Sequence, residues 1–191
     1  MSLNSDSVTP DNGPLSAGSP APEFERKPVF GLPVRVPDGA KTLVLLFIRH
    51  LGDPFARQTL AEVQDRYADF DRLGIKLVAI TQTELVTAQD FVPRYHVLCP
   101  VITDPEGTLQ AQYGIGRDGM LTGTLRGLIG TDLKRIKNAL GQGHGRKAGS
   151  SRQLPAEFVI EPGGQLVYAN YGQSITDGPD LDELLRIARA C

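Results

Sequence analysis

Two segments, the continuous apolar run TLVLLFI at 42–48 and the largely apolar IKLVAIT at 75–81, constrain the fold more than any other feature of the sequence. A strand that is apolar along its whole length must be covered on both faces, as in a sheet flanked by helices. The residues between the two runs predict a helix with one apolar face. Its stripe advances by four, three, four and three positions through Ala56, Leu60, Val63, Tyr67 and Phe70. Strand, helix and strand in this order predict a parallel crossover.

The predicted helix has residues typical of helix boundaries at both ends. Asp53 is a favoured N-cap residue, and Pro54 suits the first helical position. Gly74 follows the apolar stripe, where glycine commonly ends a helix. We therefore expect the helix to begin after Asp53 and to end near Gly74.

Further elements complete an α/β pattern. Residues 29–37 predict a short hairpin, while Thr81 and Glu84 have the spacing of a capping box for a helix that stops near Pro93. The later predictions are a strand near 100–103, a small helix ending at Tyr113–Gly114, a hairpin of AEFVI and QLVYAN around Glu161, and a terminal helix capped by Asp180. Residues 133–140, LKRIKNAL, have the pattern of a short amphipathic helix.

Charge and composition limit the classes of partner and compartment. With 20 basic against 22 acidic residues, nothing favours nucleic acid or an anionic membrane as a partner. No stretch approaches the ~20 apolar residues that span a bilayer, and the first residues lack the pattern of a signal peptide. Two cysteines and three scattered histidines form neither a disulfide framework nor a metal cluster. We expect a cytoplasmic protein that needs no metal or cofactor.

The composition also predicts how the chain is divided. Residues 1–19 are rich in Ser, Pro, Asn and Gly and predict a disordered tail. Residues 20–191 are long enough for a single domain with a sizeable core. Within it, the Gly-rich and basic stretch near 141–154 predicts a flexible, solvated loop.

The segment FIRHLGDPFAR, residues 47–57, joins the first buried strand to the helix. The first N–H groups of a helix have no partners within the helix, and its dipole adds positive potential, so this position stabilises an anion. A cysteine placed there becomes a reactive thiolate. Arg49 and Arg57 bracket the position and would strengthen the effect.

The same segment resembles the active-site strand and helix of the peroxiredoxin-like proteins, the alkyl hydroperoxide reductase/thiol-specific antioxidant family. In the most similar branch the stretch reads F-x-R-x-x-G-C-P-x-C-R. The matching residues are Phe47, Arg49, Gly52, Pro54 and Arg57. The likeness covers about residues 20–190 and includes APEF, ITDPEG and LPAEFVIEPGGQLVYAN.

This resemblance implies a thioredoxin-like α/β fold, with a central mixed β-sheet flanked by helices on both faces. It implies thiol-dependent peroxidase or oxidoreductase chemistry, and a redox partner or a homodimer. It also places Pro155 as a cis proline beside the helix start, where it would shape the pocket.

The sequence departs from the family at the two cysteines, which are replaced by Asp53 and Ala56. A thiolate attacks a peroxide because sulfur can hold the resulting sulfenic acid, and neither replacement can do this. Our leading hypothesis is a catalytically inactive relative that serves as a binding or regulatory module. Asp53 is then an N-cap, or else a general base or an anchor for a cationic ligand, and Ala56 packs on the apolar stripe. Loss of both sulfurs is compatible with natural divergence and with deliberate replacement.

Two alternatives stay open from the sequence. Arg49 and Arg57 either form a surface ion pair with Asp53 or bind a small anion or metabolite at the helix start. Cys99 lies among apolar residues, and free cysteines in such places usually pack as small buried hydrophobic side chains. The alternative is that Cys99, with or without Cys191, is the nucleophile of an active antioxidant enzyme.

Overall fold

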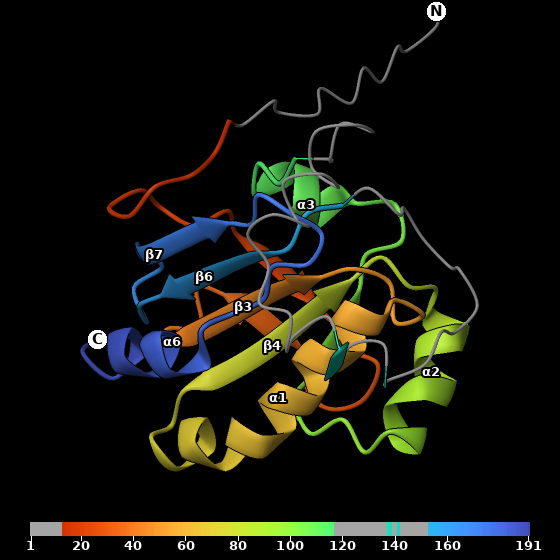
Figure 1. The fold of residues 1–191 in the computed structure, drawn as a ribbon. Helices are drawn as coiled ribbons and strands as arrows, with labels where there is room; N and C mark the ends of the chain where they lie inside the picture. The colour runs from red at the N-terminus through yellow and green to blue at the C-terminus, as the bar shows by residue number, and fades with distance from the viewer. Residues whose placement is uncertain (1–12, 117–136, 139–140, 142–152) are drawn as a thin grey trace, which may run out of the picture.

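The computed structural model describes residues 13–116, 137–138, 141 and 153–191. Figure 1 shows the helices and strands gathered around one sheet. In chain order the elements are β1 Phe24–Arg26, β2 Val34–Val36, β3 Leu43–Ile48, α1 Pro54–Arg72, β4 Lys76–Thr81, α2 Leu85–Arg94, β5 Val101–Thr103, α3 Thr108–Gln112, β6 Ala156–Ile160, β7 Leu166–Tyr171 and α6 Leu181–Ala188.

The five-stranded sheet has the order β5-β4-β3-β6-β7 and is mixed. β3 and β4 are parallel, as are β4 and β5, which confirms the predicted crossovers. β6 pairs antiparallel with both β3 and β7, so the predicted C-terminal hairpin is also present. β3 lies at the centre, and all six of its residues are buried, as its continuous apolar sequence predicts.

Both faces of the sheet are covered. On one face Val44, Leu46 and Ile48 pack in one cluster with residues of α1, α2 and α6. In Figure 1 these three helices lie along the lower side of the sheet, whereas α3 lies at the top. The alternate residues of β3 face the other way, toward α3 and the β1–β2 hairpin. Because side chains alternate along a strand, one apolar run supplies both halves of the core. The predicted α/β sheet with helices on both faces is confirmed.

Three local predictions need correction. The N-terminal hairpin pairs residues 24–26 with 34–36, so its first strand begins before the predicted range 29–37. The predicted capping box is wrong, because Thr81 is the last residue of β4 and Glu84 makes no side-chain bond to the start of α2. The disordered tail does not extend to residue 19, because Gly18 N donates to Leu166 O at 2.8 Å and Leu15 packs against the core.

Two other predictions fall mainly on residues outside the described ranges, namely the helix at 133–140 and the loop at 141–154. In the described part of the chain, no helix combines the length and the hydropathy required to cross a bilayer.

Candidate functional site

A buried ion pair occupies the start of α1, at the C-terminal end of β3. Arg49 Nη1 donates to Asp53 Oδ2 at 2.6 Å, and the two side chains are only 7% and 9% exposed. Asp53 Oδ1 accepts from the backbone N–H groups of Phe55, at 2.9 Å, and Ala56, at 3.2 Å. Both carboxylate oxygens are therefore bonded, one to a guanidinium and one to the free end of a helix. The N-cap prediction is confirmed, but the ion pair is buried rather than on the surface.

Arg57, the second predicted cation, is directed toward α2. Its Nε donates to Leu51 O at 2.8 Å. Its guanidinium carbon lies 5.4 Å from the ring centre of Phe91 and 5.2 Å from that of Tyr95. These two rings stack on each other with centres 4.2 Å apart. The structure thus brings Arg49 to Asp53, while the Arg57 guanidinium is held over two aromatic rings at the C-terminal end of α2, a contact worth about 0.5–2 kcal/mol.

Two threonines that the sequence analysis did not assign to the site support the loop before α1. Thr81 Oγ1 donates to Arg49 O at 2.8 Å, and Leu51 N donates to Thr83 Oγ1 at 2.8 Å. Both threonines are fully buried. The carboxyl ends of adjacent parallel strands meet at one edge of a sheet, so residues that end β4 lie near the residues that follow β3. The position of these threonines at the end of β4 could therefore have placed them near the start of α1.

Pro155 lies beside the helix start, as predicted. It lines a small cavity together with Ala56 and Asp177, and the cavity volume is about 10 Å³. That is room for about one water molecule. The Leu154–Pro155 bond is not cis, so that prediction was wrong; among the described residues the cis bond is Val36–Pro37. Pro155 is held in place by Gly172, whose N–H donates to Pro155 O at 2.8 Å.

Cys99 lies away from this site. Val101 is beside Ala79 in the β4–β5 ladder, so Cys99 is toward the N-terminal ends of the parallel strands, whereas Asp53 follows the C-terminal end of β3. Cys99 is 3% exposed, and burial raises the pKa of its thiol to about 12. Cys191 is exposed, and both cysteines are free. Ala56 is buried in the apolar stripe of α1.

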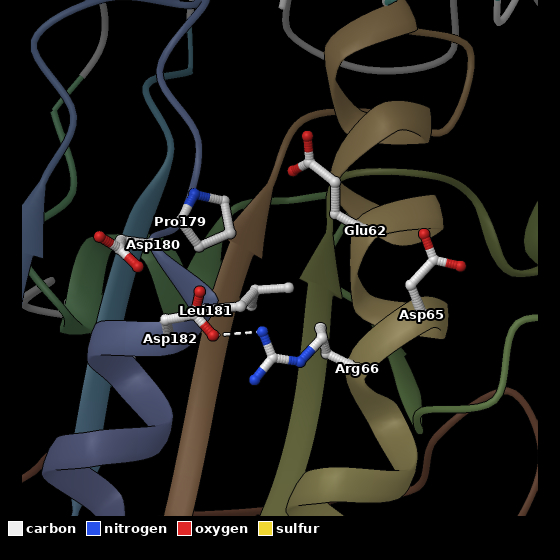
Figure 2. Close-up of a pocket in the computed structure, with 7 residues that line it drawn as sticks. All are labelled: Glu62, Asp65, Arg66, Pro179, Asp180, Leu181 and Asp182. Carbon is white, nitrogen blue, oxygen red and sulfur yellow. Dashed lines mark hydrogen bonds and ion pairs between the residues drawn. The ribbon is translucent and has the colours of Figure 1, made fainter.

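A larger hollow of about 450 Å³ lies between α1 and α6, and none of the predicted site residues lines it. In Figure 2, Arg66 reaches from α1 toward Asp182 on α6, with Glu62 and Asp65 on the same helix as Arg66. Arg66 also pairs with Asp69 at 2.9 Å. Within the described residues, no group of three or more His, Cys, Asp or Glu side chains is arranged to hold a metal ion.

Comparisons with known proteins agree on the family and the fold. The sequence matches the model of the AhpC/TSA family over residues 17–169. No curated protein matches it significantly. Among solved structures, peroxidoxin BcpB from Mycobacterium tuberculosis superposes with a TM-score of 0.66 at 18% identity, covering 92% of this chain and 97% of that one.

Two further structures are similar to a comparable degree. The reduced 2-Cys peroxiredoxin of Plasmodium vivax has a TM-score of 0.66 at 16% identity, with 93% of this chain and 82% of that chain covered. A point mutant of peroxiredoxin 6 from Arenicola marina has a TM-score of 0.66 at 18% identity, with 91% and 72% covered. At these identities the likeness shows the fold, which is the thioredoxin-like fold predicted from the sequence.

Proposed function

The chain belongs to the AhpC/TSA family, and we propose that it is a member without thiol chemistry, which serves as a binding or regulatory module. The observation that carries the proposal is the bonding of Asp53. Its carboxylate takes the guanidinium of Arg49 and two N–H groups of α1, the groups that would stabilise a thiolate at this position. Its partner, on this proposal, is a redox protein or a second copy of the chain.

The chemistry of residues 53 and 56 supports the same conclusion. Reduction of a peroxide by a thiolate transfers one oxygen to sulfur, giving a sulfenic acid and releasing water or an alcohol. A carboxylate has no corresponding oxidised form, and the Ala56 methyl group has no lone pair. The negative charge of the helix start is retained, while the atom that accepts oxygen is absent.

The two alternatives receive less support from the geometry. Cys99 is in the core, and its raised pKa leaves only about one thiol in 10⁴–10⁵ ionised near neutral pH. The helix start already holds an internal anion, and the adjoining cavity of about 10 Å³ is smaller than a phosphate or a carboxylate metabolite needs. A ligand at this place would have to displace Asp53 from Arg49.

Peroxide consumption tests the proposal directly. The native chain is mixed with hydrogen peroxide and dithiothreitol, and consumption is compared with that of Asp53→Cys and Cys99→Ser variants. We expect the native chain and Cys99→Ser to match the protein-free reaction. The thiolate introduced by Asp53→Cys would be oxidised to a sulfenic acid, which dithiothreitol reduces back with release of water. Turnover by the native chain that disappears in Cys99→Ser would replace the proposal with an active enzyme using Cys99.

A further inference from the structure

The β3–β4 ladder ends at the pair Ile48–Thr81, and hydroxyl groups continue the connection beyond it. After this pair β3 turns into the loop that leads to α1, so the two backbones separate. Thr81 Oγ1 donates to Arg49 O at 2.8 Å. Leu51 N donates to Thr83 Oγ1 at 2.8 Å, and the two hydroxyl oxygens are 3.0 Å apart.

The direction of every bond in this group follows from counting protons. Each threonine hydroxyl has one proton to donate. The proton of Thr81 goes to the carbonyl of Arg49, so the bond between the hydroxyls must be donated by Thr83. Thr83 in turn accepts the N–H of Leu51. The chain therefore runs one way, from Leu51 N–H through Thr83 and Thr81 to Arg49 C=O.

We propose that Thr83 and Thr81 are positioning residues, which through this one-way relay set the geometry of residues 49–53. Both threonines are fully buried, so a broken bond in this group leaves its donor or acceptor out of contact with bulk solvent. The relay fixes the backbone from which the Arg49 side chain starts, and it anchors Leu51 through its N–H. The carbonyl of the same residue, in the next peptide unit, accepts Arg57 Nε at 2.8 Å. One group of hydrogen bonds thus orients both arginines that flank the start of α1.

This inference deepens the proposed function, because it names what keeps the anion-stabilising arrangement in place around residue 53. It predicts an electrostatic effect as well as a structural one. If the relay loosens, the Arg49 guanidinium and the first N–H groups of α1 are held less closely to the negative charge, and an anion there is stabilised less.

The test places a titratable reporter at the site. In a chain with Asp53→Cys and Cys191→Ser, the pKa of the introduced thiol is read from its ultraviolet thiolate absorbance. Cys99 does not interfere, because its pKa is near 12. We expect Thr83→Val to raise the pKa of the introduced thiol by about one pH unit, a roughly tenfold loss of thiolate stabilisation. Thr83→Ser, which keeps the hydroxyl, should leave it within a few tenths.

If Thr83 only stabilised the fold, its substitution would lower the melting temperature without changing the pKa of the introduced thiol. Thr42→Val, at a buried threonine on the other end of the sheet, is the matched control and should leave the pKa of the introduced thiol unchanged. Equal pKa values in Thr83→Val and Thr83→Ser, with only a lower melting temperature in the former, overturn the proposal. If Thr83→Val does not fold, Thr81→Val interrupts the relay at its other threonine and carries the same expectation.

A measurement on the unaltered chain completes the test. The amide of Leu51 should exchange with deuterium at least about 100-fold more slowly than an exposed amide, because its partner is a buried hydroxyl. Exchange at the rate of an exposed amide overturns the relay without any variant. Both readings are independent of peroxide turnover by the native chain, so failure of the relay and failure of the proposed function remain distinguishable.

Discussion

Breaking the Arg49–Asp53 pair should destabilise the protein far more than breaking a pair on the surface. Asp53→Ala removes the N-cap acceptor, a loss of about 0.5–2 kcal/mol, and leaves the Arg49 charge buried beside an alanine. Removing one partner of a buried pair costs about 3–5 kcal/mol. Since the side chains are 7% and 9% exposed, we expect the buried value to dominate. The result is a large part of the ~5–15 kcal/mol that holds a typical domain folded.

Three variants separate the contributions. Asp53→Asn keeps an oxygen for the N–H groups of Phe55 and Ala56 but removes the charge, so its loss should be mostly that of the ion pair. Arg49→Met leaves the carboxylate buried with its helix bonds alone. The double variant, Arg49→Met with Asp53→Asn, removes both charges of the pair and should recover most of the loss, because hydrophobic replacement of a buried pair is often neutral.

Urea denaturation measures these free energies, with equal m-values as the check on two-state comparison. The double-mutant cycle should give a coupling of about 2–3 kcal/mol between the two positions. Asp182→Asn is the matched control, because Asp182 is 78% exposed in its pair with Arg66 and should cost about 1 kcal/mol or less. Additive single losses, or an Asp53→Ala loss no larger than that of Asp182→Asn, would refute the reasoning.

Two other features give predictions of their own. Burial raises the pKa of the Cys99 thiol from its usual 9 to about 12, so its contribution to stability is complete below about pH 8.5 and is lost as the pH rises toward 12. The free energy of unfolding of the native chain, measured with urea, should therefore fall more steeply between about pH 7.5 and 10.5 than that of the Cys99→Ala variant. An equal fall in the two proteins would contradict the raised pKa of Cys99. Gly172→Ala places a Cβ 2.7 Å from Pro155 Cγ and should cost about 1–3 kcal/mol. Gly163→Ala, with its nearest contact at 3.7 Å, is the control, and equal losses in the two variants would count against this close packing.

The elements that could be predicted from the sequence are those whose pattern is local. β3 has no polar residue to turn toward water and is too short for a typical helix, and the stripe of α1 has a helical period, so each pattern favours one structure. The cap at Asp53 is equally local, because its partners are the N–H groups of Phe55 and Ala56 in the same turn. These interactions form within a few residues and depend little on the rest of the chain.

The predictions that failed depend on partners distant in the sequence. Thr81 and Glu84 have the spacing of a capping box, but Thr81 pairs beside Ile48 in the sheet, and its hydroxyl bonds the carbonyl of Arg49, 32 residues away. Tertiary pairing prevails over local spacing here. The Gly- and Ser-rich segment around Gly18 was predicted to be disordered, yet it bonds the backbone of Leu166 on β7. Backbone N–H and C=O groups can pair with the edge strand β7 whatever side chains the segment carries, so its composition does not reveal this pairing.

The burial of the ion pair explains how this helix start can differ in chemistry and keep its structure. Whatever carries the charge at residue 53 meets the same three donors: the Arg49 guanidinium and the N–H groups of Phe55 and Ala56. A carboxylate offers two oxygens to them where a thiolate offers one sulfur, so the aspartate bonds Arg49 and caps the helix at once. On the proposed function, the aspartate therefore bonds all three of these donors while lacking the polarisable sulfur atom. On the same proposal, the constraint that remains on residues 49–57 is electrostatic and structural. Asp53→Asn should therefore lower the free energy of unfolding even though no redox chemistry is lost.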